Sequence, residues 1–460
     1  MASEQKTADK KPAKSRRVDL TVGPVHKHLI RMAIPMIIGL MASMSFTFVD
    51  LFYIGRLGTD ELAAMGFVTR MIMIIISASI GLSAGISSVL ARAAGNKDDG
   101  EVKMLATNTL LFTVLLSLVF TVVGLLTIDP LFTAMGADEN IMPLIREYVT
   151  IWYFSPIFIM VPMTGGSVMR ALGDTKLQGN LMLFSAIGNA VLDPILIFGL
   201  IGFPELGLQG AAWASLITRF ISFVAILYFL TYKFHVICIK RETLSKFTSA
   251  VKKTMHVGIP ATGTNMIIPI VAVFIISIIA KYGNEAVAAT NVATTIESLS
   301  LVLFFSLSAV VGPFIGQNLG ADNFDRIEEC IKKASIFCLL WGGFMALLLA
   351  ALAPTLANMF SDEPEIASIT ISYLYVVPAS YGLYGLVMSV NAMFNAIGKP
   401  MPGVVISTFR VFVLQLPLVY LASILYDLQV AFILISVSNM VAGVLGYFWI
   451  EKVITQLKNA

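Results

Sequence analysis

The chain has 460 residues, of which 57% are hydrophobic and 13% are charged, and its formal net charge is +3. A soluble domain carries about 25% charged residues, so this composition excludes an ordinary soluble protein and predicts a membrane-embedded one. Its three cysteines, Cys238, Cys330 and Cys338, are odd in number and fit no zinc or redox spacing, so we expect no disulfide framework and no cofactor.

Apolar runs long enough to cross a bilayer, which takes about 20 helical residues, occur twelve times. Before them lies a basic, Lys- and Ala-rich segment, residues 1–28, which we expect to be disordered and cytoplasmic. A basic stretch at 233–253 divides the runs into two sets of six, within 29–232 and 254–451, and a short tail follows at 452–460. The runs lie near 29–53, 61–90, 105–128, 143–169, 179–202, 208–232, 254–280, 286–315, 331–353, 367–394, 402–425 and 428–451. The predicted fold class is an all-α polytopic membrane protein with twelve transmembrane helices.

Lysine and arginine indicate the orientation, because cytoplasmic loops retain them. An even number of spans puts both termini on one side. Of the 31 basic residues, 25 fall in segments on that side, and three (Arg56, Arg146 and Lys281) fall on the other. We therefore expect a multi-pass protein of a bacterial or archaeal cytoplasmic (inner) membrane, with both termini in the cytoplasm.

The two sets of six spans are copies offset by 225 residues. Ile34-Pro35 recurs as Ile259-Pro260, and Ala171-Leu172-Gly173 recurs as Ala396-Ile397-Gly398. Six spans keep the same orientation in both copies, so the halves should be related by an axis along the membrane normal, with substrate bound between them. This arrangement favours a transporter over the alternatives of a channel and a membrane enzyme. No serine–histidine pair, Walker motif or metal-ligand cluster favours enzymatic chemistry.

Three acids lie well inside the spans: Asp50, Asp193 and Glu297. Charges inside a membrane are costly, which makes them candidates for function. Asp50 and Asp193 share a depth in the outer half of the first lobe, Asn189 lies one turn before Asp193, and Ser215 belongs to the same polar layer. This layer predicts the site of a coupling ion. Its oxygens suit Na⁺, with Asp50, Asn189 and Asp193 as ligands. Its two carboxylates can also share a proton, since close like charges disfavour double ionisation.

The second half lacks this layer, because Ile275, Leu414 and Leu418 stand at the positions equivalent to its two acids and its amide. Glu297 falls at the depth that Arg70 has in the first half. The sequence allows an ion pair between them across the central cleft, or the alternative that each faces its own half.

An ordered series of motifs resembles the multidrug and toxic compound extrusion (MATE) family, and in particular its DinF-like branch. The resemblance covers nearly all of residues 29–450. Its motifs are Ile34-Pro35, Asp50-x-x-Tyr53-Ile54-Gly55-Arg56-Leu57-Gly58, Arg170-Ala171-Leu172-Gly173-Asp174, Gly210-Ala211-Ala212-Trp213-Ala214-Ser215, and Gly312-x-x-x-Gly316-Gln317-Asn318-x-Gly320-Ala321. It implies a V-shaped pair of six-helix lobes, monomeric and without nucleic-acid partners. Such proteins export amphipathic or cationic compounds across the lipid bilayer in exchange for protons or sodium.

Candidates for the substrate cleft are soft, apolar or aromatic side chains near the acidic layer, since such surfaces accept varied ligands. They are Ser43, Phe46, Phe48, Trp152, Tyr153, Met163 and Met182. Pro35 and the Gly165-Gly166 pair are candidate bending points, because they loosen helical hydrogen bonding. In the family, the first span is proposed to bend at this proline when the acid is protonated.

The predicted function is therefore secondary active multidrug efflux by cation antiport with alternating access, with H⁺ favoured over Na⁺. The alternative is a lipid-linked glycan flippase of the same superfamily, which needs a more basic central cavity for a pyrophosphate. We expect no such cavity here, because the three arginines inside spans (Arg70, Arg219 and Arg410) balance the three acids, and we expect Arg219 and Arg410 to be structural.

Overall fold

The structure is a computed structural model that describes residues 18–360 and 363–459, all of them helical or in connections, with no strand in these ranges. Residues 1–17 of the predicted disordered segment lie outside the described residues. Eleven helical segments in these ranges are long and apolar enough to cross a membrane, and α5 with α6 makes a twelfth if this pair, bent by 50°, is one span. The prediction of an all-α polytopic membrane protein is confirmed.

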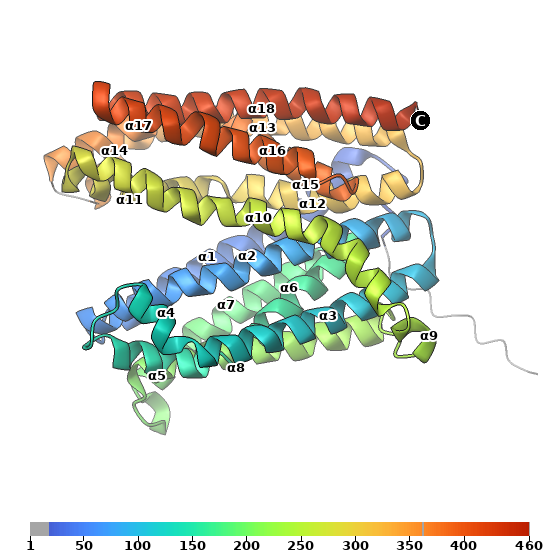
Figure 1. Ribbon diagram of the computed structural model, residues 1–460, viewed down its shortest axis with the longest axis horizontal. Coiled ribbons are helices and arrows are strands. Elements are labelled where there is room, and N and C mark those ends of the chain that lie inside the picture. Colours follow the sequence, from blue (N-terminus) through green and yellow to red (C-terminus); the bar gives the residue numbers. More distant parts are fainter. Residues whose placement is uncertain (1–17, 361–362, 460) are drawn as a thin grey trace, which may run out of the picture.

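The helices follow the two predicted halves in chain order (Figure 1). The first half comprises α1 (Val25–Ile54), α2 (Thr59–Gly95), α3 (Asp99–Leu126), α4 (Ile128–Ala134), α5 (Met142–Trp152), α6 (Pro156–Ala171), α7 (Lys176–Ile197), η1 (Leu200–Gly202), α8 (Gly207–Tyr228) and η2 (Phe229–Lys233). The connection between the halves contains α9 (Arg241–Leu244). The second half comprises α10 (Phe247–Ile279), η3 (Ala280–Tyr282), α11 (Asn284–Ser300), α12 (Val302–Gly320), α13 (Phe324–Phe360), α14 (Pro364–Val376), η4 (Val377–Ser380), α15 (Tyr381–Ala396), α16 (Met401–Thr408), η5 (Phe409–Gln415), α17 (Leu416–Leu425) and α18 (Leu428–Lys458).

Each half has its own hydrophobic core, and the first helix joins both. Figure 1 shows the helices of the first half below those of the second, with the C-terminus at the same end as α9. The start of α1 packs into the core of the second half through Leu29, Met32 and Met36, while its last residue, Ile54, belongs to the core of the first. This helix therefore crosses the boundary between the halves.

Small residues allow a close crossing between the halves, that of α2 with α10. A Cβ atom built on Gly81 would lie 2.0 Å from the Thr262 Oγ1 atom, and one on Gly85 would lie 2.4 Å from the Thr254 carbonyl oxygen. Helices in a membrane approach this closely only where side chains are absent. Glycine at these positions thus fixes where the two halves touch.

The segment before α1 differs from the predicted disorder of residues 1–28. Leu20 is fully buried, and the backbone of Val18 donates a hydrogen bond to the Leu172 carbonyl oxygen at 3.1 Å. Helix α1 begins at Val25, four residues before the predicted start of the first half. Composition alone predicted disorder, but one buried leucine and its backbone partners hold this segment against the helix ends.

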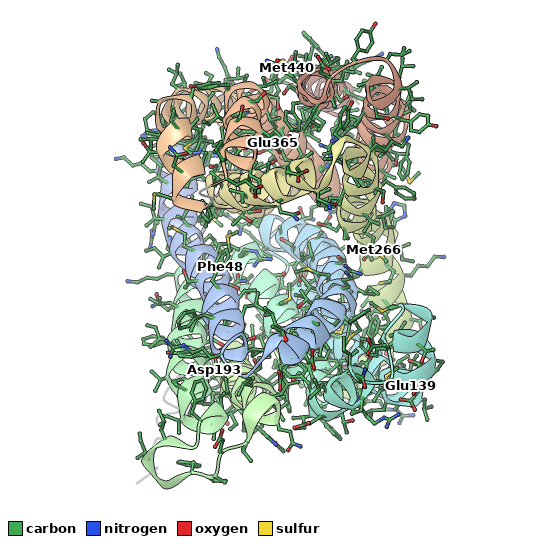
Figure 2. The ribbon with its side chains drawn as sticks, turned by 90° about the vertical axis from the view of Figure 1, so that its left-hand side faces the viewer. Phe48, Glu139, Asp193, Met266, Glu365 and Met440 are labelled. Atoms are coloured by element: carbon green, nitrogen blue, oxygen red, sulfur yellow. The ribbon has the colours of Figure 1, made fainter. Side chains whose placement is uncertain are left out.

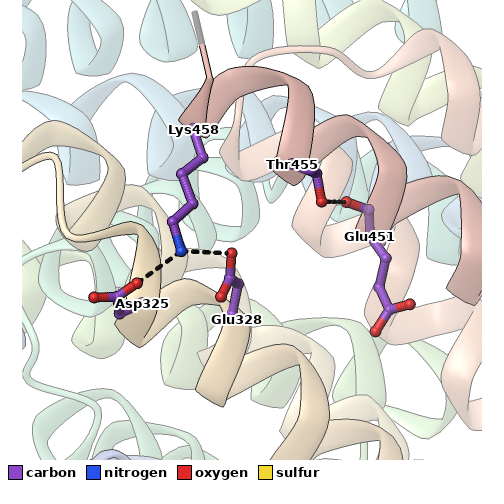
Figure 3. A network of polar contacts seen from close by, with 5 residues as sticks. All are labelled: Asp325, Glu328, Glu451, Thr455 and Lys458. Atoms are coloured by element: carbon purple, nitrogen blue, oxygen red, sulfur yellow. Dashed lines mark hydrogen bonds and ion pairs between the residues drawn. The ribbon is translucent and has the colours of Figure 1, made fainter.

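The last helix runs on through most of the predicted tail, to Lys458. Figure 3 shows the Lys458 Nζ atom between two carboxylates of α13, 2.8 Å from Asp325 Oδ1 and 3.1 Å from Glu328 Oε1. One turn earlier, the Thr455 hydroxyl donates a hydrogen bond to the Glu451 carbonyl oxygen. These ion pairs are exposed to solvent and screened by it, so they align α18 with α13 and contribute little to the stability of the fold.

Candidate functional site

The predicted acidic layer is buried inside the first half, where α1 packs against α7. Asp50 is 7% exposed, and Asn189 and Asp193 are fully buried. Figure 2, viewed from the end that carries α4 and α14, shows Asp193 further from the second half than Phe48. One oxygen of Asp50, both oxygens of Asp193 and both amide atoms of Asn189 are buried without a hydrogen-bond partner in the described structure. Because buried polar atoms are nearly always satisfied, the oxygen atoms among them are candidate ligands for a proton or a small cation.

Two residues that the sequence analysis did not place there complete the layer, Tyr148 from α5 and Arg219 from α8. The Tyr148 ring is almost fully buried, and its hydroxyl lies next to Ser215, which is also buried. The Arg219 guanidinium lies over the Trp152 ring, 5.7 Å from its centroid. Its charge interacts with that of Asp50, although the two form no direct ion pair. Arg219, predicted to be structural, therefore lies beside the candidate coupling site.

Arg70 and Glu297 do not form the ion pair that the sequence allowed as one of two alternatives. Arg70 is exposed on α2, and Glu297 instead accepts a hydrogen bond from the Tyr373 hydroxyl of its own half. The nearby basic group is Arg410, also of the second half. Equivalent depth in the repeat did not bring the two side chains together, because it does not fix which way each helix face points.

A cavity of about 660 Å³ lies between the two halves. Four of the predicted cleft residues line it, namely Ser43, Phe46, Met163 and Met182. The remaining three do not, and these predictions are wrong. Trp152 and Tyr153 are buried inside the first half, because the 50° bend between α5 and α6 turns this part of the chain away from the cavity, and Phe48 is 49% exposed outside the lining.

The predicted bending points are sites of close packing. A Cβ atom on Gly165 would lie 2.8 Å from the Ile226 Cγ1 atom, and one on Gly166 would lie 2.5 Å from the Gln178 Cδ atom. Pro35 lies inside the continuous helix α1, and its carbonyl oxygen is only 2.2 Å from where a Cβ atom on Gly179 would be. Bending at these positions stays a prediction.

The cavity is closed at the end that carries the described termini by a pair of equivalent hydrogen bonds between the halves. The Gln317 Nε2 atom donates to the Ala171 carbonyl oxygen at 2.7 Å. The Arg92 Nη1 atom donates to the Ala396 carbonyl oxygen at 3.1 Å. The donors, like the acceptors, are 225 residues apart, so the two contacts are copies related by the internal repeat. We call this set of contacts the seal.

The segment before α1 lies across the seal. The Leu20 backbone donates to the Gln317 Oε1 atom at 3.0 Å and its carbonyl oxygen accepts from Asn318 Nδ2 at 3.2 Å. Above the seal, the Ser88 hydroxyl lines the cavity and donates to the Asn395 carbonyl oxygen at 2.5 Å. The seal is therefore the floor of the cavity.

The charges that line the cavity differ from those expected. Among the described residues, the lining contains three arginines (Arg170, Arg219 and Arg410) and no carboxylate. Arg70 is not part of the lining, and Asp50, Asp193 and Glu297 lie behind it. The predicted balance of three arginines against three acids is thus wrong for the cavity, whose lining is basic.

Comparisons with known proteins agree with this architecture. The MatE family model matches residues 35–195 and 260–421, two matches that begin at the same offset as the repeated motifs. The chain is 32% identical over 442 residues to an FAD transporter of Shewanella oneidensis (96% of this chain, 98% of the relative) and 26% identical over 459 residues to the probable multidrug resistance protein YoeA of Bacillus subtilis (97% and 96%).

Solved structures give the same result. The Vibrio cholerae MATE transporter VcmN in its bent form superposes with a TM-score of 0.89 at 29% identity, covering 94% of this chain and 97% of that one. An outward-facing multidrug resistance MATE family transporter superposes with a TM-score of 0.90 at 26% identity, covering 98% of this chain and 100% of that one. These relatives are transporters, not enzymes. The chain belongs to the MATE family of multi-pass membrane transporters.

Proposed function

We propose that this protein exports small amphipathic molecules by antiport against a cation bound at Asp50, Asn189 and Asp193. The observation that carries the proposal is the cluster of buried oxygens without partners in these three side chains, inside one half of a transporter fold. A buried carboxylate without a partner is costly, and a bound proton or Na⁺ removes that cost. The proton is the favoured ion, since two neighbouring carboxylates readily share one, and sodium is the alternative.

Arg219 supplies a physical link between the cation and the substrate. It lines the cavity, and its charge also interacts with that of Asp50. Neutralising Asp50 therefore changes the electric field at the cavity wall. Antiport requires such a link, because a cation can shift the conformational equilibrium only through its different affinities for the two states.

The seal supports alternating access between two orientations of the halves. We assign the sealed end to the cytoplasm, as the distribution of lysine and arginine predicts, which makes this conformation outward-facing. In the inward-facing state the hydrogen bonds of Gln317 and Arg92 break, and the cavity opens to the cytoplasm of a bacterial cell. The proposal places one chain in the inner membrane as the working unit.

One relative is named as an FAD transporter and another as a probable multidrug resistance protein. The proposal covers amphipathic compounds of either kind. The basic lining removes one argument against a lipid-linked glycan flippase. Membership of the MATE family nevertheless favours export of small molecules over that alternative.

Transport and binding by the purified full-length protein test the proposal. We expect Asp50→Asn and Asp193→Asn to abolish gradient-driven accumulation of a fluorescent substrate in proteoliposomes, while leaving substrate binding in detergent largely intact. A matched control is Ile275→Asn, at the equivalent position of the second half. Gradient-driven accumulation by Asp50→Asn at the rate of the unmodified protein would refute the cation site.

A further inference from the structure

We infer that the central cavity is an anion-binding site, in which Arg170, Arg219 and Arg410 bind the negatively charged group of an amphipathic organic anion. The inference rests on the proposed function for the direction of transport, but the binding site stands on its own geometry. It reverses the sign of charge that the family resemblance implies for the substrate.

The positive charges of these arginines are not neutralised by direct ion pairs. Arg170 donates hydrogen bonds to neutral partners, the Gln178 Oε1 atom at 2.5 Å and the Ser167 hydroxyl at 2.7 Å. Arg410 donates to the Asn439 Oδ1 atom at 2.7 Å and lies over the Tyr384 ring, 4.7 Å from its centroid. Neither forms an ion pair with a described carboxylate. Arg410 is buried and Arg170 is partly buried. A guanidinium removed from water with only neutral partners is costly, and an anionic ligand reduces that cost.

Arg219 and Arg410 also keep spare donors. The Arg219 Nη1 and Arg410 Nε atoms are buried without a hydrogen-bond partner. The nearest acids, Asp50 for Arg219 and Glu297 for Arg410, attract them from behind the lining without a direct ion pair. When these two acids are neutralised, no nearby negative charge offsets the positive charges of Arg219 and Arg410.

The arginines stand at two levels and on both walls of the cavity. Arg170 lies in the last turn of α6, next to Ala171 of the seal, so it is at the floor. Arg219 lies near the middle of α8 in the first half. Arg410 lies in the π-helical turn η5 of the second half, and such turns, which change the direction of a side chain, are frequent at functional sites. The planar fork of arginine suits phosphate and carboxylate groups, which it binds through paired hydrogen bonds.

The rest of the lining suits the uncharged part of such a ligand. Apolar and aromatic side chains of both halves face the cavity, among them Phe46, Phe158, Phe305, Met182 and Met388. Hydroxyl and amide groups lie between them. Soft and aromatic surfaces accept varied ring systems, so the charge rather than the shape of the ligand provides the main selection.

Binding of two dyes with the same xanthene ring system tests the sign of the charge. Fluorescein is an anion at pH 8, and rhodamine 123 is a cation. Equilibrium dialysis of the purified full-length protein in detergent needs no ion gradient, so it is independent of the proposed antiport. We expect fluorescein to bind at least about tenfold more tightly than rhodamine 123, because a hydrogen bond between a guanidinium and an anion is about twice as strong as one between neutral groups. Equal binding, or tighter binding of rhodamine 123, would overturn the inference.

Charge-removing variants test the residues. Arg170→Gln and Arg410→Gln should each weaken fluorescein binding about tenfold or more, whereas Arg170→Lys, which keeps the charge, should weaken it less. The matched control is Arg70→Gln, because Arg70 is an exposed arginine outside the lining. Fluorescein affinity that is the same in all four variants would refute the assignment. If arginine-dependent binding is found but no gradient drives fluorescein transport, the proposed antiport fails and the anion site stands.

Discussion

Arg92 and Gln317 occupy equivalent positions in the two halves, and each donates a side-chain hydrogen bond to the equivalent carbonyl oxygen of the opposite half. The backbone of each residue also lies against a glycine at the equivalent position of the opposite half. A Cβ atom on Gly95 would lie 2.0 Å from the Gln317 carbonyl oxygen, and one on Gly320 would lie 2.2 Å from the Arg92 carbonyl oxygen. The seal is therefore made of two equivalent contacts related by the internal repeat, and both must break for the cavity to open at this end.

Adding a methyl group at either glycine should force the seal open. In Gly95→Ala and Gly320→Ala the new Cβ meets backbone, which cannot move aside, and overpacking of this kind costs about 1–3 kcal/mol. We expect at least about tenfold faster labelling of Ser87→Cys, a cavity position, by an impermeant thiol reagent applied from the cytoplasmic side, in a background without the native cysteines.

The control for this experiment is Gly66→Ala, in the same helix as Gly95, where a Cβ atom would have no neighbour within 4 Å. Its labelling rate should equal that of the parent protein. Equal rates in all three alanine variants would show that the contact does not hold the cavity closed.

The segment before α1 should stabilise the seal. Leu20 is fully buried and Val22 is 61% exposed, so Leu20→Asp and Val22→Asp form a matched pair. Burying a leucine side chain contributes about 2 kcal/mol, and a buried aspartate adds a further cost. Leu20→Asp should lower the melting temperature of the purified protein and speed labelling of Ser87→Cys, and Val22→Asp should do neither. Identical behaviour of the two variants would argue against this role.

The two halves should contribute unequally to ion coupling. Asp50→Asn should abolish cellular resistance to exported compounds without loss of expression, because it removes a carboxylate of the buried layer. Ile275→Asn should have a mild effect, since Ile275 is an apolar side chain packed against the core of the second half. The measurement is growth inhibition together with protein level in membranes. Equal loss of resistance in both variants would contradict a single site in the first half.

Thiol labelling also tests the orientation. Ser245, beside α9, and Glu205, before α8, are both exposed and lie on opposite sides in the predicted topology. In intact cells, a single cysteine at Ser245 should be protected from an impermeant reagent, and one at Glu205 should react. The reverse pattern would require the opposite orientation.

The sequence was sufficient for the spans, the repeat and the acidic layer, and insufficient for the directions of side chains. A run of apolar residues identifies a span, and an acidic residue inside such a run is predicted to be buried. Both predictions need only the position of each residue along the span. Rotation about the helix axis depends on packing, which explains why Tyr148 was missed and Trp152 was misplaced around the α5–α6 bend. For the same reason, depth alone could not decide whether Arg70 and Glu297 form an ion pair.

Disorder was overpredicted where a few specific contacts outweigh composition. Residues 18–24 fall in the segment that was predicted to be disordered. Leu20 is nevertheless fully buried, and its backbone forms hydrogen bonds with Gln317 and Asn318. The basic lining was missed because Arg170 is part of a family motif at a helix end and was not counted among residues inside the spans. Its place at the cavity floor depends on how the halves meet, which the sequence of one helix does not contain.

Cation coupling through the layer of Asp50 and Asp193 can be tested by transport in proteoliposomes under separately imposed pH and sodium gradients. We expect a pH gradient alone to drive accumulation of the exported dye, an uncoupler to stop it even in saturating sodium, and Asp50→Asn to show no response. Accumulation that persists without a pH gradient and rises with an opposing sodium gradient would replace the proton by sodium at the same residues. Accumulation by Asp50→Asn equal to that of the unmodified protein under both gradients would contradict the claim itself.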